Sequence, residues 1–273
     1  ETEINAIGYC VGGTLLAAAL ALFAQECDHR IASATLFTTQ VDFVHAGDLM
    51  VFADAENIDS IEENMKDRGY LDGSKMATAF NMLRSSELIW PYVVNNYLKG
   101  KEPMPFDLLY WNSDATRMPA ANHSFYLRNC YMENNLSNGR MVLDGKTLSL
   151  KDVKIPIYNL AAREDHIAPA QSVFEGCRYF GGKVTYVMSG SGHIAGVVNP
   201  PAKKKYQYWT GTKPQGDFSA WVSKAKEHPG SWWPHWHEWI EKQDKEMVPA
   251  RIPGGGKLNA IEDAPGSFVK IRV

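Results

Sequence analysis

The sequence predicts an α/β fold built on parallel strands, and three observations support this prediction. A strand-like segment at 4–9 is followed by a glycine-rich turn, an apolar run at 15–24 and a β-branched run at 32–41. This order is typical of a strand, a helix and a second strand parallel to the first. The segments 154–160 and 183–188 have the composition of two further core strands. Polar or reactive residues follow several of these strands directly, at the edge where ligands gather in open α/β sheets.

The composition of the 273-residue chain excludes several function classes. Hydrophobic residues make up 45% and charged residues 22%, which is ordinary for a globular protein. The net charge of −3 gives no indication of nucleic-acid binding or of attraction to an anionic membrane. The four cysteines show neither a disulfide framework nor zinc-ligand spacing, so we expect a reducing cytoplasm and no metal. The apolar run 15–24 is too short for a transmembrane segment.

The first candidate for chemistry is Cys10, which lies in Gly8-Tyr9-Cys10-Val11-Gly12. This is the G-x-S-x-G pattern of a nucleophile elbow, with cysteine in place of serine. We expect Gly8 and Gly12 to let the strand and the helix approach each other closely. A helix N-terminus favours a thiolate and offers free N–H groups, so the N–H of Val11 is the expected oxyanion donor. The alternative is a structural cysteine beside a glycine-rich bend.

Asp165 and His193 supply the partners that a nucleophilic cysteine needs. Each follows one of the later strands, and the chain order of nucleophile, acid and histidine is that of the α/β-hydrolase fold. His193 would accept the thiol proton of Cys10, and Asp165 would orient the imidazole. Taken singly, Asp165 could cap a helix and His193 could be an ordinary loop histidine. Two further candidate pocket residues are His166, beside the acid, and Asp42, at the end of the second strand.

The strand pattern divides this one catalytic domain into three segments. Residues 1–42 hold the elbow and the start of the α/β-hydrolase core, and residues 43–140 predict a mainly helical cap, or lid, inserted over the site. Residues 141–273 predict the rest of the core and a loop-like, Trp-rich tail. Six of the eight tryptophans lie between 209 and 239, where they could form a polymer-binding surface or, as is more common, pack inside. Because an elbow normally follows several strands, its early position predicts an N-terminally truncated fragment.

Motifs along nearly the whole chain resemble those of the catalytic domain of polyhydroxyalkanoate synthases. The matching segments are Gly8–Gly13, Asn95–Gly100, Phe106–Asp114, Arg163–Pro169, Ser191–Pro201 and Gly230–Pro234. The helix containing Tyr126–Asn129 and the loop around Trp111 are most similar to the class I enzymes of this family.

The resemblance implies that Cys10, Asp165 and His193 are catalytic, beneath a cap formed roughly by residues 43–125. It implies repeated acyl transfer from (R)-3-hydroxyacyl-CoA, such as 3-hydroxybutyryl-CoA, to a growing polyester through a Cys-bound acyl intermediate. Coenzyme A is released, and no cofactor other than the coenzyme A thioester substrate is implied. The expected partners are a second copy of the chain, bound through the cap, and the surface of a polyester granule in the cytoplasm.

Two other functions stay open on the residues alone. A Cys-nucleophile α/β-hydrolase, such as a thioesterase or a dienelactone-hydrolase-like enzyme, would share the triad but release an acid to water. A non-enzymatic granule-surface protein would use the Trp-rich region and would not need Cys10. The elbow and its two strand-end partners argue against this second alternative.

Overall fold

A six-stranded sheet carries the residues that the sequence singles out. The computed structural model describes residues 3–83, 85–103 and 116–271, and the strand order is β1-β2-β5-β6-β7-β8. The parallel strands are β1 (Ile4–Tyr9), β2 (Ile31–Phe37), β5 (Ile157–Ala162) and β6 (Val184–Ser189). The antiparallel strands are β7 (Gln207–Thr210) and β8 (Lys226–Pro229). The predicted parallel core is confirmed, whereas β7 and β8 lie where the sequence predicts only a loop-like tail.

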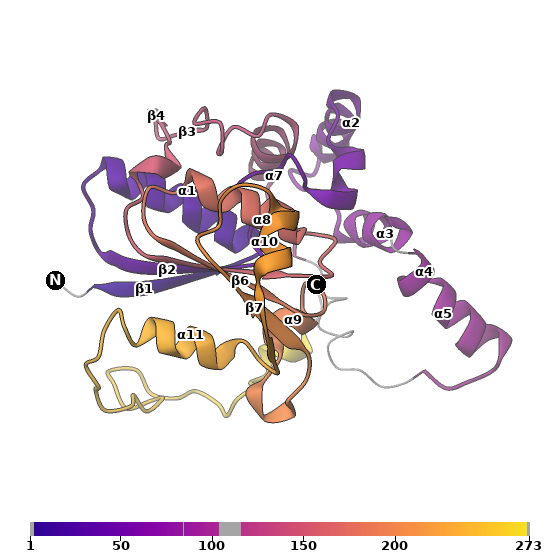
Figure 1. Ribbon diagram of the computed structural model, residues 1–273. Coiled ribbons are helices and arrows are strands. Elements are labelled where there is room, and N and C mark those ends of the chain that lie inside the picture. Colours follow the sequence, from indigo (N-terminus) through magenta and orange to yellow (C-terminus); the bar gives the residue numbers. More distant parts are fainter. Residues whose placement is uncertain (1–2, 84, 104–115, 272–273) are drawn as a thin grey trace. The chain divides into compact units, whose positions relative to one another are not determined.

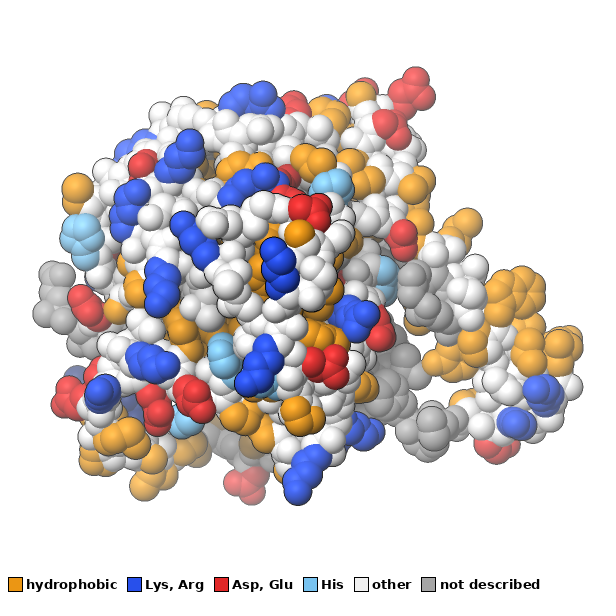
Figure 2. Space-filling view, in the orientation of Figure 1, with side chains coloured by type: hydrophobic (Ala, Val, Ile, Leu, Met, Phe, Trp, Pro, Cys, Tyr) orange, Lys and Arg blue, Asp and Glu red, His pale blue; other side chains and the backbone are white. Residues whose placement is uncertain are grey.

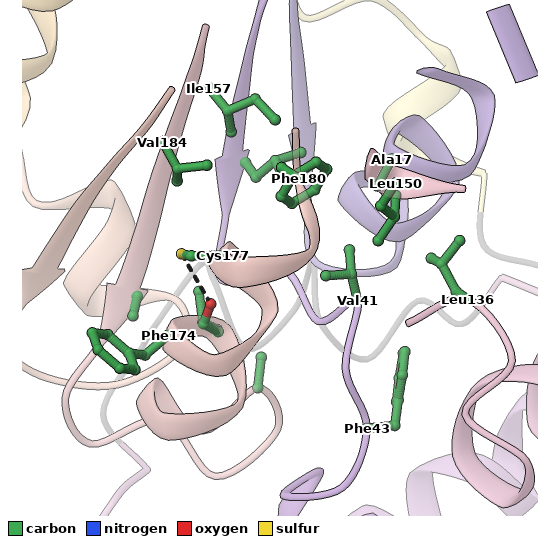
Figure 3. Packing of buried hydrophobic residues seen from close by; sticks show 14 of the residues in the cluster. Ala17, Val41, Phe43, Leu136, Leu150, Ile157, Phe174, Cys177, Phe180 and Val184 are labelled. Atoms are coloured by element: carbon green, nitrogen blue, oxygen red, sulfur yellow. Dashed lines mark hydrogen bonds between the residues drawn. The ribbon is translucent and has the colours of Figure 1, made fainter. Parts of the chain in front are cut away.

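Helices cover both faces of the sheet (Figure 1). Helices α1 (Val11–Gln25) and α8 (Ala170–Gly176) lie on one face and α11 (Trp233–Ile240) lies on the other. The alternation of β5 explains the two layers, because Ile157 packs in the cluster under α1 whereas Tyr158 packs in the cluster under α11. Figure 3 shows part of the larger cluster, where Ala17 of α1 lies among branched and aromatic side chains.

A second apolar cluster occupies the α11 face of the sheet. Its buried members are Phe37, Tyr158, Leu160, Val187, Val197, Trp232 and Trp239. The indole N–H of Trp232 donates to the carbonyl oxygen of Gly196 at 2.9 Å, and that of Trp236 donates to the Thr35 hydroxyl at 3.0 Å. Trp232 and Trp239 therefore pack inside the fold, and Trp232 and the partly buried Trp236 also hydrogen-bond there, as the packing interpretation predicts.

The described chain contains further short elements. They are η1 (Gly47–Phe52), α2 (Ala55–Met65), α3 (Gly73–Leu83), α4 (Ser85–Leu88), α5 (Trp90–Tyr92), η2 (Val93–Leu98), α7 (Ala120–Tyr126), η3 (Leu127–Met132), β3 (Val142–Leu143), β4 (Lys146–Thr147), η4 (Leu150–Asp152), η5 (Cys177–Tyr179), α9 (Ala195–Val198), η6 (Pro201–Lys203), α10 (Phe218–Lys224) and η7 (Phe268–Lys270). The motif Phe106–Asp114, which includes Trp111, lies outside the described residues.

The chain forms two compact units. One comprises Glu1–Asp59 and Ser124–Lys245 and contains the six-stranded sheet, and the other comprises Ser60–His123 and Glu246–Val273. These boundaries differ from those of the predicted cap, since residues 43–59 and 124–140 belong to the unit with the sheet. The second unit does contain the helices α3, α4 and α5 of the predicted cap segment.

On the face shown in Figure 2, basic side chains are interspersed with other side chains over the sheet-containing unit.

Across the described part of the chain, every helix is too short or too polar to pass through a lipid bilayer.

Candidate active site

Cys10 lies in a strained turn between β1 and α1. Because β1 ends at Tyr9 and α1 begins at Val11, the chain reverses at a single residue. Its backbone has φ 55° and ψ −126°, and a positive φ is uncommon for a residue with a Cβ atom. The N–H of Cys10 donates to the carbonyl of Phe37 at 2.9 Å, and its carbonyl accepts from the N–H of Gly13 at 2.9 Å. This is the geometry of a nucleophile elbow, held by hydrogen bonds on both sides.

The close approach at the elbow occurs at Gly8 and Gly13. A Cβ atom on Gly8 would lie 2.5 Å from the Cα of Gly13, and one on Gly13 would lie 1.8 Å from the Thr39 hydroxyl oxygen. A Cβ atom on Gly12 would meet no described atom within 4 Å. The expectation for Gly12 is therefore wrong, because Gly12 is exposed on the first turn of α1 whereas Gly13 is buried.

Asp165 and His193 are in contact, although they follow different strands. Asp165 comes after β5 and His193 after β6, and their side chains meet at 2.6 Å between Oδ2 and Nδ1. The other carboxylate oxygen accepts the N–H groups of Ile167 at 2.8 Å and Ala168 at 2.9 Å. The Asp165 side chain is fully buried and that of His193 is 11% exposed. The carboxylate is thus fixed by three donors and can hold the imidazole in one orientation.

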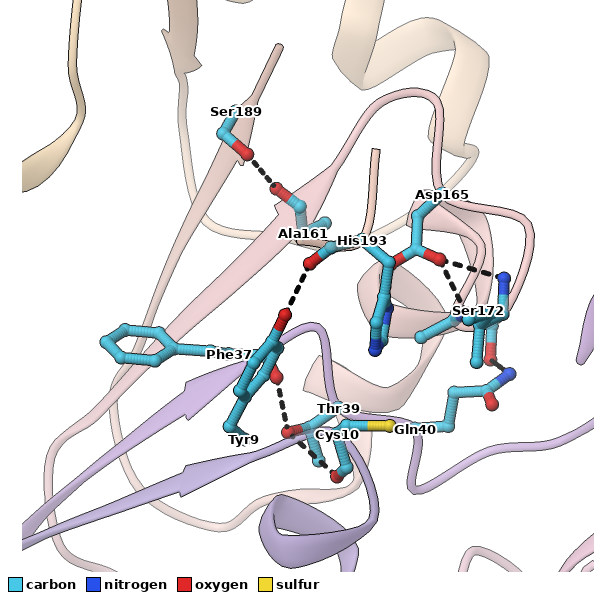
Figure 4. A network of polar contacts seen from close by, with 12 residues as sticks. Tyr9, Cys10, Phe37, Thr39, Gln40, Ala161, Asp165, Ser172, Ser189 and His193 are labelled. Atoms are coloured by element: carbon cyan, nitrogen blue, oxygen red, sulfur yellow. Dashed lines mark hydrogen bonds and ion pairs between the residues drawn. The ribbon is translucent and has the colours of Figure 1, made fainter. Parts of the chain in front are cut away.

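The imidazole of His193 lies between Asp165 and the sulfur of Cys10 (Figure 4). Burial lowers the pKa of His193, but hydrogen bonds to Asp165 and Cys10 and the negative charges of both outweigh it and raise the pKa to about 9. Since Nδ1 is bonded to Asp165, the other ring nitrogen is left for the thiol. The structure therefore brings Cys10, His193 and Asp165 together as a nucleophile, a proton acceptor and an orienting acid.

Val11 is the first residue of α1, a helix of 15 residues. The first N–H groups of a helix have no acceptor within the helix, and the helix dipole adds partial positive charge there. The N–H of Val11 directly follows the nucleophile at this helix N-terminus, which is the position that the sequence predicts for the oxyanion donor.

Asp42 belongs to a buried structural network. Its Oδ1 accepts from the N–H of Val44 at 3.1 Å and from the Asn134 amide at 2.8 Å, and its Oδ2 accepts from the Tyr179 hydroxyl at 3.0 Å. These bonds use both carboxylate oxygens and connect the end of β2 with two later segments. They show that Asp42 caps the loop after β2 and ties it to those two segments. His166 is half-buried in the loop directly after Asp165.

Three tyrosines near the triad are not among the site residues that the sequence predicts. The Tyr9 hydroxyl donates to the backbone carbonyl of His193 at 2.7 Å, and the two rings stack with centroids 5.4 Å apart. Tyr126 and Tyr131 pack edge to face at 5.5 Å. Burial raises the pKa of both well above the ordinary value, and the charge of Cys10 contributes to both shifts. Only the position of Tyr9 beside Cys10 could have indicated its role.

The other described cysteines differ from Cys10. Cys130 and Cys177 are buried, and burial raises the pKa of each to about 12, whereas Cys27 is exposed. Buried thiols of this kind are poor nucleophiles. Among the residues that the structure describes, no group of three or more His, Cys, Asp or Glu side chains could hold a metal ion.

Comparisons with known proteins agree with the α/β fold of this chain. A family model described as the alpha/beta hydrolase fold matches residues 1–200. Over 272 residues the chain is 72% identical to the poly(3-hydroxyalkanoate) polymerase subunit of Rhizobium meliloti, covering all of this chain and 44% of that protein. Over 273 residues it is 63% identical to a poly(3-hydroxyalkanoate) polymerase of Methylorubrum extorquens, covering all of this chain and 45% of that protein. The chain thus spans about half the length of these curated relatives.

A solved enol-lactonase from Burkholderia xenovorans LB400 aligns over 72% of this chain and 61% of its own, with 16% identity and a TM-score of 0.34. This likeness is too weak to support any inference about activity.

Proposed function

Because the chain belongs to the alpha/beta hydrolase family and matches poly(3-hydroxyalkanoate) polymerases along its whole length, we propose that it carries the catalytic thiol of such a polymerase. The proposed activity is acyl transfer, in which (R)-3-hydroxyacyl-CoA is polymerised to a polyester and coenzyme A is released. The observation that carries this proposal is the contact of Cys10, His193 and Asp165 at the elbow.

The first half of the proposed reaction loads the enzyme. His193 takes the proton of the Cys10 thiol, and the thiolate attacks the thioester carbonyl of the acyl-CoA. The N–H of Val11 donates to the oxyanion that forms. The carbon–sulfur bond to coenzyme A then breaks, and the imidazolium of His193 returns its proton to the leaving thiolate. The product is a thioester of Cys10 and free coenzyme A.

The second half extends the chain. The 3-hydroxyl group of another acyl unit attacks the thioester of Cys10, and His193, supported by Asp165, accepts the hydroxyl proton. An ester bond forms and the Cys10 thiolate leaves, ready to be reprotonated or loaded again. Exchange between two thioesters is close to thermoneutral, so the acyl enzyme stays reactive toward an alcohol. A site that excludes water favours this transfer over hydrolysis.

The finer parts of the proposal concern specificity and partners. We place the protein with the class I enzymes, acting on short-chain substrates such as 3-hydroxybutyryl-CoA. Its partners would be a second copy of the chain, bound through the cap, and the surface of a cytoplasmic polyester granule. The reaction as written needs no cofactor beyond the coenzyme A of its substrate.

The decisive experiment incubates the full-length protein with 3-hydroxybutyryl-CoA and measures polyester, free 3-hydroxybutyrate and coenzyme A. The proposal predicts insoluble polyester together with coenzyme A, and the loss of both in Cys10→Ala. Cys27→Ala is the matched control, because it removes an exposed thiol away from the elbow and should retain full activity. Coenzyme A together with free acid and no polyester would instead identify a Cys-dependent hydrolase.

A further inference from the structure

Tyr9 makes two separate contacts with His193. Its hydroxyl donates to the backbone carbonyl oxygen of His193 at 2.7 Å. Its ring lies nearly parallel to the imidazole, with centroids 5.4 Å apart and an interplanar angle of 23°. One side chain therefore contacts both the backbone and the ring of the same histidine (Figure 4).

The loop that carries His193 contains an uncommon backbone conformation. It connects β6 with α9, and Ser191 within it has a φ of 69°, which is uncommon for a residue with a Cβ atom. Asp165 holds the Nδ1 edge of the imidazole, and the thiol of Cys10 bonds its other nitrogen. Bonds at the two nitrogens leave the ring free to rotate about the line that joins them, so a contact on the face of the ring is needed to fix its plane.

The position of Tyr9 makes it suited to this task. It is the last residue of β1 and the neighbour of Cys10, so its backbone is part of the elbow. Its ring packs against the second apolar cluster on the far side from the helix α1. Burial, with the negative charges of Cys10 and Asp165, raises the pKa of Tyr9 far above the ordinary value. The hydroxyl therefore stays protonated and serves as a hydrogen-bond donor, not as an acid or a base.

We propose that Tyr9 is a positioning residue that fixes the imidazole of His193 between Asp165 and Cys10. The hydroxyl holds the loop through the carbonyl of His193, and the ring holds the plane of the imidazole. This inference rests on the proposed role of Cys10 as the nucleophile, but not on the identity of the substrate.

The test compares Tyr9→Phe, which keeps the ring, with Tyr9→Leu, which removes the aromatic plane. Tyr208 provides a matched control, because it stacks on His228 at 4.8 Å and 15° and packs against the same second apolar cluster. In the full-length protein, mass spectrometry measures the rate at which iodoacetamide alkylates Cys10 as a function of pH. The kcat and KM of coenzyme A release and the urea midpoint of unfolding are measured on the same variants.

For Tyr9→Leu we expect Cys10 to be alkylated at least about ten-fold more slowly at neutral pH, with the rise in rate moved to higher pH. Tyr9→Phe should recover the rate to within about five-fold of wild type, the effect of one neutral hydrogen bond. In both variants kcat should fall with KM nearly unchanged. Tyr208→Leu should leave the alkylation profile unchanged even where it lowers the urea midpoint.

Two results would overturn the inference. One is an alkylation profile of Tyr9→Leu that coincides with that of the wild type. The other is an equal slowing in Tyr208→Leu, which would reduce the effect to general destabilisation. Alkylation does not require an acyl-CoA, so a slowing in Tyr9→Leu without any polyester from the wild type would reject the polymerase proposal and leave Tyr9 in its role.

Discussion

Replacing Gly13 by alanine should damage the elbow, whereas the same change at its neighbour Gly12 should not. The new Cβ atom at residue 13 would lie 1.8 Å from the hydroxyl oxygen of Thr39, 2.7 Å from its methyl carbon and 2.8 Å from its Cβ. Thr39 cannot easily move away, since it is buried and its hydroxyl donates to the carbonyl of Phe37 at 3.1 Å. Overpacking of this kind lowers the free energy of unfolding by about 1–3 kcal/mol.

The expected shift of Gly13→Ala is a fall in Tm of roughly 2–12 °C, from a cost of about 1–3 kcal/mol and about 2–4 °C per kcal/mol for a chain of this size. Gly12→Ala meets no described atom within 4 Å. It should leave the free energy of unfolding unchanged or raise it by up to about 1 kcal/mol through helix propensity. Thermal and urea unfolding of the two variants, side by side in the full-length protein, measures the difference.

A double-mutant cycle with Thr39→Ala locates the cause. Removing the hydroxyl and the methyl group of Thr39 relieves the two shortest contacts, so Gly13→Ala should cost less in this background. Equal Tm values and urea midpoints for Gly13→Ala and Gly12→Ala would refute this account of the elbow. So would a loss of unfolding free energy on Gly13→Ala that is the same in the wild type and in Thr39→Ala.

Two further predictions concern protons and thiols. The pKa of His193 is raised from 6.5 to about 9, so its contribution to stability is fully present below about pH 6.5 and is lost as the pH rises through 9. The urea midpoint of unfolding of the wild type should therefore fall between these pH values. An equally steep fall of the midpoint with pH in Asp165→Asn would contradict this prediction. Under native conditions iodoacetamide should modify Cys10 well before Cys130 or Cys177, because burial raises the pKa of the latter two to about 12; modification of either at the rate of Cys10 would argue against their burial.

The strand ends were predictable from the sequence because each carries its own local pattern. A β-branched or apolar run followed by a polar residue indicates where a strand stops, and parallel strands bring their carboxyl ends to one edge. This is why Asp165 and His193, 28 residues apart in the chain, could be expected to meet. The strands β7 and β8 carry no such pattern, since each has four residues and β8 is mostly polar and exposed.

Contacts between distant residues without a motif could not be predicted. The hydroxyl of Tyr9 reaches a residue 184 positions away, and the carboxylate of Asp42 bonds partners 92 and 137 positions away. The two partners of Asp42, Asn134 and Tyr179, have no sequence spacing that distinguishes them from other polar residues. The same holds for the close approach at Gly13, which depends on the side chain of Thr39 and not on the elbow motif itself.

The most direct test of the central claim is whether Cys10 carries the acyl group. The full-length protein is mixed with 3-hydroxybutyryl-CoA, quenched in acid and digested, and the peptide that contains Cys10 is examined by mass spectrometry. The account predicts 3-hydroxybutyryl units on Cys10, removable by hydroxylamine as expected for a thioester, and their absence in Cys10→Ala. Polyester formed by Cys10→Ala, or an acyl group found on another residue while Cys10 stays free, would contradict it.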